Sequence, residues 1–292
     1  MAGSLNFAAP TAHEYFAVLV ADDASLSLLE TAIAVAQDDD PRLDPQGVLA
    51  QVDMLADKLR RRLPADAAPL QRLRLLNTYF FHELGFAGNV NDYYDRRNSY
   101  VSEVLKTRRG IPITLAVLYI EIAQQIGLHA EGVSFPGHFL VKLQMPRGEV
   151  VIDPFSGHSL SRDDLEERLA PFRLQIRSAA LAADASAPIG PYLKAASGRE
   201  VIARLLRNLK EIHRSAGDRL RLVGVMHRLV ILLPRAWDER RDRAHVLADL
   251  GRLEEAMADL ALYLEHRPDA DDAPRLRRQL AAWQQRPAAR RH

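Results

Sequence analysis

An internal period of 34 residues in the last third of the chain restricts its fold more than any other sequence feature. Gly217 and Gly251 are separated by this distance, and so are Pro234 and Pro268. Glycine commonly follows the end of a helix, where the backbone turns left-handed, and proline cannot continue a helix. A period of this length with these stop signals predicts stacked pairs of helices. Residues 186–292 are therefore predicted to form a helical repeat array.

The apolar positions of the two copies also correspond: Met226 with Leu260, Leu229 with Tyr263, and Val230 with Leu264. The second copy, ADLGRLEEAMADLALYLEHRP, closely resembles the tetratricopeptide repeat, with Gly251, Ala256 and Pro268 at consensus positions. The first copy departs from that pattern because Leu222 stands where a small alanine should pack. A further helix around 276–283 is expected to cap the array, and stacked repeats need neighbours to bury their faces.

Composition indicates a globular protein of two domains. The chain has 292 residues, of which 48% are hydrophobic and 26% charged. No apolar run approaches the roughly 20 residues that span a bilayer, and residues 1–10 lack the pattern of a signal peptide, so a cytoplasmic location is expected. The absence of cysteine excludes disulfides, thiolate metal sites and a thiol nucleophile. No metal site or cofactor is predicted, since no histidine spacing or glycine-rich loop supports one.

Charge is unevenly distributed along the chain. Residues 199–292 carry a net charge of +6 and residues 1–198 one of −5. This asymmetry could serve an acidic partner, but a solvated surface is the commoner explanation. Binding to nucleic acid is not favoured, because the chain shows no recognised DNA-binding module and its positive excess is modest.

The first domain is predicted to be α+β and to occupy residues 1–185. Helices are expected over 26–37, capped by Ser25, over 45–63 and over 70–84. A structured loop follows over 85–100, and residues 111–122 are so uniformly apolar or small that they predict a buried central helix. Pro112 suits its first turn. Two β-rich runs, GVSFPGHFLVKLQ and EVVIDPF, are joined by a hairpin turn at 145–148. Helices resume at Arg162, and a linker is expected within 179–198.

The chain resembles the SirB-type bacterial family in three consecutive sequence segments, GIPITLAVLY, FPGHFLV and VIDPF. Members of that family are commonly labelled transglutaminase-like and regulators of the expression of a neighbouring regulatory gene. The resemblance is dense over 80–155, looser over the N-terminal helices, and includes the repeats. It implies a papain-like core, in which one buried helix packs on a small antiparallel sheet, followed by tetratricopeptide-type repeats.

The resemblance also implies a site. In the wider superfamily, a cysteine at the start of a buried helix is activated by a histidine and an aspartate on adjacent strands. The match places His138 at the histidine, Asp153 at the aspartate and Pro112 at the nucleophile. Proline has no nucleophilic atom, and the nearest hydroxyl belongs to Thr114. The site is therefore expected to be vestigial.

The register of the hairpin decides whether the histidine and the aspartate share a face. A two-residue loop of Pro146 and Arg147 would point His138 and Asp153 the same way, whereas a third loop residue, Gly148, would point them apart. The sequence leaves both registers open. By itself, such a pair is more often a structural hydrogen bond than a catalytic dyad.

The loop before the central helix supplies further candidates. Tyr94, Asp95, Asn98 and Ser99 could line the cleft of His138, or could instead cap and fix the loop. Arg109, next to Arg108, precedes a helix N-terminus, where a bound anion and a solvated charge are the two alternatives.

Two functions remain compatible with the sequence. The favoured one is a non-catalytic transglutaminase-like module that binds a protein or peptide, with the repeats as a second binding surface. The alternative is a hydrolase or acyltransferase, in which Thr114, Ser99 or a water replaces the thiol and His138 is the base. No membrane contact is expected, and nothing in the sequence indicates the oligomeric state.

Overall fold

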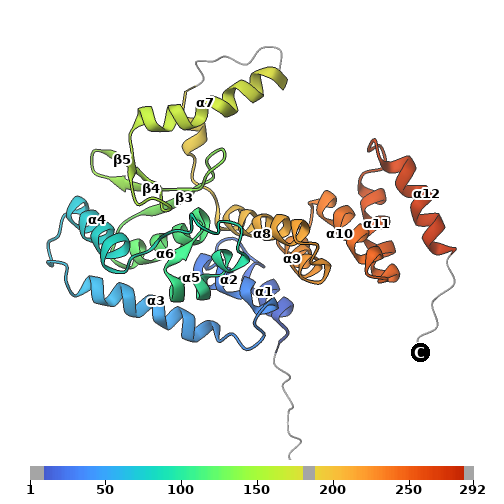
Figure 1. Ribbon diagram of the computed structural model, residues 1–292, viewed down its shortest axis with the longest axis horizontal. Helices are drawn as coiled ribbons and strands as arrows, with labels where there is room; N and C mark the ends of the chain where they lie inside the picture. Colours follow the sequence, from blue (N-terminus) through green and yellow to red (C-terminus); the bar gives the residue numbers. More distant parts are fainter. Residues whose placement is uncertain (1–9, 180–187, 286–292) are drawn as a thin grey trace, which may run out of the picture. The chain divides into compact units, whose positions relative to one another are not determined.

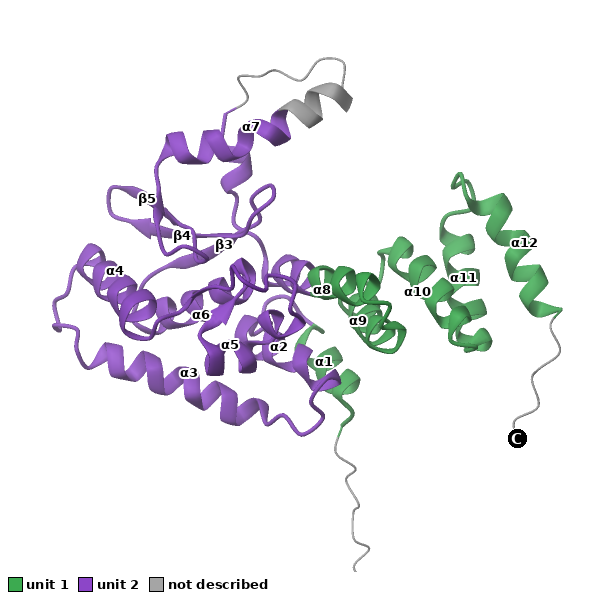
Figure 2. Cartoon of the chain, viewed as in Figure 1, with its two compact units in different colours: residues 1–21, 206–292 green, residues 22–205 purple. Residues whose placement is uncertain are grey.

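The chain forms two compact units, shown in separate colours in Figure 2. A computed structural model describes residues 10–179 and 188–285, without the side chains of 174–179. One unit comprises residues 22–205, and the other combines residues 1–21 with 206–292. The division falls within helix α8 (Gly198–Ser215), whereas the predicted domain boundary at 185/186 lies outside the described residues.

The unit of residues 22–205 surrounds one central helix and one small sheet (Figure 1). Its elements before the central helix are α2 (Leu28–Ala34), η1 (Val35–Asp38), α3 (Pro45–Arg60), α4 (Pro69–Asn77), η2 (Thr78–Glu83), β1 (Ala87–Gly88), η3 (Arg96–Ser99), α5 (Val101–Thr107) and β2 (Arg109–Gly110). The central helix α6 (Pro112–Gln125) is followed by β3 (Ala130–Val133), β4 (Leu140–Met145), β5 (Gly148–Ile152), β6 (Ser159–Leu160), α7 (Arg162–Ala179) and η4 (Gly190–Leu193).

Two local predictions for the first helices need correction. The N-cap of α2 is Ser27, whose hydroxyl accepts from the Glu30 N–H, and not Ser25. The helix expected over 70–84 changes at Thr78 into a π-helical turn, in which the Leu84 N–H reaches the Tyr79 carbonyl. A π-turn inserts one residue into the helical period, which a hydrophobic pattern does not reveal.

Helix α6 is buried over its first nine residues, 112–120, as its sequence predicts. It begins at Pro112, and its residues through Ile120 are all buried. Proline fits this position because the first helical N–H has no intrahelical acceptor. The helix packs against β3 and β4, and the apolar residues around it explain why residues 112–120 show no polar face.

The four-stranded sheet is antiparallel, in the order β3-β4-β5-β6. Met145 pairs with Gly148, so the hairpin loop holds only Pro146 and Arg147. The two-residue register, one of the two left open by the sequence, is therefore the observed one. Helix α7 covers the sheet face opposite α6 (Figure 1), and its Leu165 and Leu169 join the apolar residues of the strands in one cluster.

The second unit repeats its geometry at the predicted period. Helix α9 (Arg219–Leu232) returns 34 residues later as α11 (Leu253–His266), and the last residues of α8 and α10 (Trp237–Asp249) are offset by the same amount. Gly217 and Gly251 both adopt positive φ, 68° and 77°, just after these helix ends. Helix α12 (Ala273–Gln284) follows the repeats, and Leu276 and Trp283 pack into their apolar cluster.

The N-terminal helix α1 (Ala12–Leu19) belongs to this second unit, although residues 1–185 were predicted to form one domain. It packs on α9, where the guanidinium of Arg228 lies 4.9 Å from the centroid of the Phe16 ring. Both side chains are fully buried. A helix this short has no sequence signal for the partner on which it packs.

In the described part of the chain, every helix is too short or too polar to cross a bilayer.

Candidate functional site

His138 and Asp153 meet at one end of the hairpin formed by β4 and β5. His138 lies two residues before β4 begins, and Asp153 directly follows β5. The Nε2 atom of His138 lies 2.8 Å from Oδ1 of Asp153. The short hairpin loop gives these positions the same parity, which explains how residues 15 apart in sequence come into contact.

Asp153 is held as a buried carboxylate by three donors. Oδ1 also accepts the Phe155 N–H at 2.9 Å, and Oδ2 accepts Nη1 of Arg168 at 3.0 Å. Burial alone would raise the pKa of Asp153, but the hydrogen bond and charge of His138, with the bonds from Phe155 and Arg168, hold this pKa well below its usual range. An ionised Asp153 can only accept, so Nε2 of His138 donates to it, and Nδ1 is the ring atom turned away from the carboxylate, an acceptor whenever the ring carries a single proton.

The helix end of the expected site is closed. Thr114 is fully buried, and its hydroxyl donates to the carbonyl oxygen of Asn98 at 2.6 Å, with the Ile111 carbonyl oxygen at 3.1 Å. Pro112 is buried at the first helical position. The Thr114 hydroxyl therefore fixes the start of α6 to the preceding loop and is not free to attack a substrate.

Asn98 connects the loop before α5 to the central helix. Its side-chain amide donates to the carbonyls of Asp92 (2.6 Å) and Tyr93 (3.2 Å) and accepts from the side chain of Asn89 (3.0 Å). Its own carbonyl accepts the Ile111 N–H as well as Thr114. Asn98 is 4% exposed. It shapes the loop from within and does not face solvent.

Two other candidates from this loop, Asp95 and Ser99, and the candidate Arg109 of β2 have different surroundings. Asp95 caps the short helix η3 by accepting the Arg97 N–H at 2.9 Å and pairs with the Arg97 guanidinium. Ser99 is fully buried. Arg109 donates to the carbonyls of Gly85 (2.6 Å) and Arg108 (2.9 Å), so it also fastens backbone segments.

An exposed aromatic surface adjoins His138. We define the aromatic surface as Tyr93, Tyr94 and Phe155. The rings of Tyr93 and Tyr94 are 5.3 Å apart, Tyr93 and Phe155 are 5.9 Å apart, and Phe155 and His138 are 6.5 Å apart, centroid to centroid. Tyr94 is 78% exposed and Tyr93 43%. Large apolar side chains exposed next to one another are typical of binding surfaces.

Gly88 fixes the position of Phe155 on this surface. Its N–H donates to the Phe155 carbonyl at 2.9 Å, and a Cβ at Gly88 would lie 2.3 Å from the Phe155 ring. Only glycine allows this approach.

Sequence reasoning missed Arg168 and Phe155 as parts of the site. Phe155 follows Asp153 by two residues within the run VIDPF, a signal that was available. Arg168 comes from α7, and no spacing or motif links it to Asp153. Among the described residues, no three histidine or carboxylate side chains are grouped as metal ligands would be.

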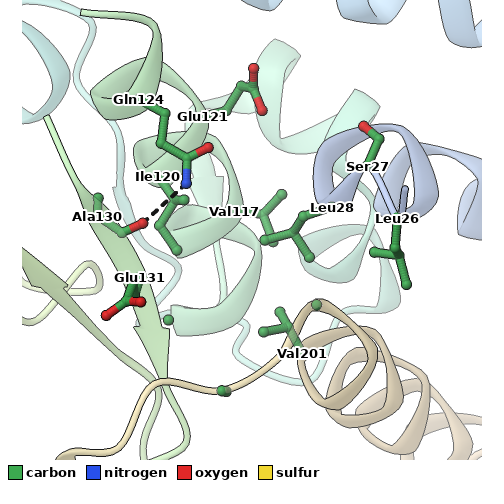
Figure 3. A pocket seen from close by; sticks show the side chains of 13 residues that line it. Leu26, Ser27, Leu28, Val117, Ile120, Glu121, Gln124, Ala130, Glu131 and Val201 are labelled. Carbon is green, nitrogen blue, oxygen red and sulfur yellow. Dashed lines mark hydrogen bonds between the residues drawn. The ribbon is translucent and has the colours of Figure 1, made fainter. Parts of the chain in front are cut away.

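A hollow of about 400 Å³ lies elsewhere in the same unit and is drawn in Figure 3. Its apolar lining includes Val117 and Ile120 of α6 and Val201 of α8. The side-chain amide of Gln124 donates to the Ala130 carbonyl at its edge, at 3.1 Å. None of the predicted site residues lines it, so the hollow is distinct from the surface around His138.

Comparison with known proteins agrees with this architecture. Residues 46–207 match the family model of the transglutaminase-like superfamily, and residues 209–281 match that of the tetratricopeptide repeat. No solved structure matches the chain.

Bacterial relatives match along most of the chain. A UPF0162 protein of Xylella fastidiosa (strain Temecula1) is 35% identical over 257 residues, which cover 88% of this chain and 89% of the relative. A UPF0162 protein of Pseudomonas aeruginosa is 30% identical, with 77% and 78% covered. Human F-box only protein 21 is 44% identical over 72 residues, which are 25% of this chain and 12% of that protein. The chain thus belongs to the SirB-type (UPF0162) family of the transglutaminase-like superfamily, with a tetratricopeptide repeat region after the transglutaminase-like domain.

Proposed function

We propose that this protein is a non-catalytic binding module that recognises a protein or peptide segment at the aromatic surface. The observation that carries this proposal is the continuity of the exposed Tyr93 and Tyr94 rings with Phe155 and His138. Tyrosine provides a large, rigid contact area and a hydroxyl for hydrogen bonding. Nδ1 of His138 is suited to accept a hydrogen bond from a backbone N–H of the bound segment.

The closed helix end supports binding without turnover. Thr114, the nearest hydroxyl to the nucleophile position, is fully buried and donates to backbone carbonyls. A serine or threonine nucleophile needs both access and an adjacent base, because its free pKa leaves almost no alkoxide. This geometry favours a pseudoenzyme whose histidine orients a partner.

The repeats support a partner that is a protein. Tetratricopeptide arrays commonly bind extended peptides and helices of other proteins. We propose that the repeats contribute a second surface for the same partner, which would give the module a regulatory role through assembly.

A pull-down with matched variants tests the proposal. The doubly substituted protein Tyr93→Ala/Tyr94→Ala should recover at least about tenfold less partner than the wild type, since two exposed anchors can carry most of the binding energy. Met54→Ala is the control, because Met54 is an exposed apolar side chain on α3 of the same unit. Equal recovery by both variants would refute the aromatic surface as the binding site.

One observation favours the alternative, a hydrolase or acyltransferase. His138 is oriented by an ionised Asp153, as a general base would be, and Nδ1 could take a proton from an attacking water. This function predicts hydrolysis of an ester or amide that His138→Gln abolishes while the melting temperature stays within about 2 °C of the wild type. Absence of turnover across acyl substrates, with peptide binding retained, would leave the binding module as the function.

A further inference from the structure

Arg204 lies beside the turn that carries His138. It belongs to α8 and to the same compact unit as that turn. Its Nη1 atom donates to the Ser134 hydroxyl at 2.9 Å and to the Phe135 carbonyl oxygen at 3.3 Å. The same Phe135 oxygen accepts the His138 N–H at 3.1 Å. One oxygen atom therefore binds both the guanidinium of Arg204 and the backbone of His138.

The guanidinium of Arg204 is fixed in place and still reached by solvent. It lies over the buried ring of Phe139, 5.6 Å from the centroid. The side chain as a whole is partly exposed. In the described part of the chain, its Nε and Nη2 atoms make no hydrogen bond, and neither atom is enclosed. An arginine held in this way can present its remaining N–H groups to a ligand with little further loss of side-chain freedom.

Arg204 carries a charge that no neighbouring carboxylate neutralises. No Asp or Glu side chain of the described residues lies within ion-pair distance of it. Arg168, the other arginine close to His138, is paired with Asp153 at 3.0 Å. Burial lowers the pKa of the Arg204 guanidinium, and the nearby Tyr93 partly offsets this effect. Partly buried charges are normally paired, so Arg204 is suited to a carboxylate of a bound molecule.

His138 links Arg204 to the aromatic surface. Its backbone shares the Phe135 oxygen with Arg204, and its ring lies 6.5 Å from that of Phe155, centroid to centroid. Burial raises the pKa of the Tyr93 hydroxyl, and the charge of Arg204 opposes this rise, which agrees with the same proximity. A cation, an oriented imidazole and exposed aromatic rings therefore occur on one part of this unit.

We propose that Arg204 binds a carboxylate of the segment that the aromatic surface recognises. This inference rests on the proposed function and adds a chemical feature of the partner. Nε and Nη2 form a fork that matches the two oxygens of a carboxylate. The carboxylate belongs to an Asp or Glu side chain or to the C-terminus of the segment, which share this chemistry. A phosphate would favour several cations, and Arg168 is already neutralised by Asp153.

Titration of the full chain with phenylacetate tests the carboxylate site without a peptide. Phenylacetate carries one ring and one carboxylate, and uncharged phenylacetamide is its matched control. The backbone amide resonance of His138 follows binding by NMR in every variant. The wild type should bind phenylacetate at least about tenfold more tightly than phenylacetamide. Equal affinities would overturn the proposal, and this comparison within the wild type depends on no variant.

Two variants show whether Arg204 is the group responsible. Arg204→Gln should bind phenylacetate as weakly as phenylacetamide. Arg207→Gln is the control, because Arg207 stands one turn further along α8 and is paired with Glu239 at 3.2 Å. It should keep the preference of the wild type for phenylacetate. An unchanged affinity of Arg204→Gln for phenylacetate would contradict the assignment.

Peptide selection distinguishes the two sources of the carboxylate. Peptides with free and with amidated C-termini are selected on the wild type and on Arg204→Glu. Enrichment of Asp or Glu in both libraries would assign a side chain, and enrichment in the free library alone would assign the C-terminus. Arg204→Glu should lose this preference and enrich Lys or Arg.

The same selection separates this inference from the proposed function. Enriched peptides with no preference for a carboxylate would refute the role of Arg204 and leave the aromatic surface as the binding site. Saturable binding of phenylacetate without any enriched peptide would refute the proposed peptide recognition and leave a carboxylate site at Arg204.

Discussion

The expected catalytic site has two halves, one at the strand ends and one at the start of the central helix, and they differ in exposure. At the strand ends, His138 remains partly exposed and is oriented by the buried carboxylate of Asp153, which Arg168 also holds. At the helix end, Pro112 and Thr114 are buried, and the threonine hydroxyl is bonded to backbone. The strand half keeps a polar group facing outward, whereas the helix half has become part of the core.

This difference shows that the orientation of a histidine does not depend on a nucleophile opposite it. Asp153 is fixed by Phe155 and Arg168, neither of which comes from α6. The oriented histidine of the strand half can therefore serve binding even though the residues of the helix half are packed in the core.

The largest expected effect comes from the residue that closes the helix half. Asn98→Ala removes side-chain bonds to two backbone carbonyls and to Asn89 from a buried position. We expect the free energy of unfolding to fall by about 3 kcal/mol, because buried backbone groups lose their partners. Urea unfolding measures this change. Asn89→Ala, which removes one of these bonds, should cost less, and an equal loss would contradict the central place given to Asn98.

Asp153→Asn tests the strand half. It should lower the free energy of unfolding by about 2 kcal/mol, since Arg168 and His138 lose a charged acceptor but Arg168 keeps solvent access. Because the folded-state pKa of Asp153 lies below the usual 3.8, its stabilisation is present above that pH and is lost as pH falls toward the lowered value. Acidification from pH 5 to pH 3 should thus destabilise the wild type more than the variant in chemical unfolding. Parallel acid profiles would show that the carboxylate contributes nothing.

The sequence predicts some features of this contrast and not others. The period of 34 residues, the buried helix from Pro112 and the hairpin were all predicted and are confirmed. The hairpin register was not predictable, because the sequence at 146–148 is compatible with both a two-residue and a three-residue loop. Arg168 was not predicted as a site residue, because its ion pair with Asp153 is long-range and leaves no local sequence pattern.

Asn98 illustrates why site residues are harder to predict from the sequence than helices and strands. Polar residues in a loop suggest exposure and function, and here one of them is a buried organiser of backbone. Only packing distinguishes the two, since Tyr94 and Asn98 stand in the same loop with opposite exposure.

A smaller effect is expected at Thr114. Thr114→Val should cost about 1–2 kcal/mol through the lost bond to the Asn98 carbonyl, while Thr114→Ser, which keeps the hydroxyl, should cost about 1 kcal/mol or less. Thermal unfolding compares the pair. Peptide binding should survive in both variants. If Thr114→Val abolished an acyl-transfer activity that Thr114→Ser kept, the helix half would be catalytic after all.

The smallest effect on stability is expected on the aromatic surface. Tyr94→Ser should change the free energy of unfolding by no more than about 0.5 kcal/mol, because the side chain is mostly exposed. Partner binding should nevertheless weaken by about tenfold. Calorimetric titration with the recovered partner measures the second quantity. Unchanged affinity would show that the partner binds at another surface.

Binding without turnover at the aromatic surface is tested most directly by a peptide selection. Peptides are selected on the wild type with counter-selection on the Tyr93→Ala/Tyr94→Ala variant, and each enriched peptide is then incubated with the protein and weighed by mass spectrometry. We predict enriched peptides that bind the wild type and are recovered at unchanged mass. Peptides that are cleaved or acylated by the wild type, but not by His138→Gln, would contradict a non-catalytic binding module.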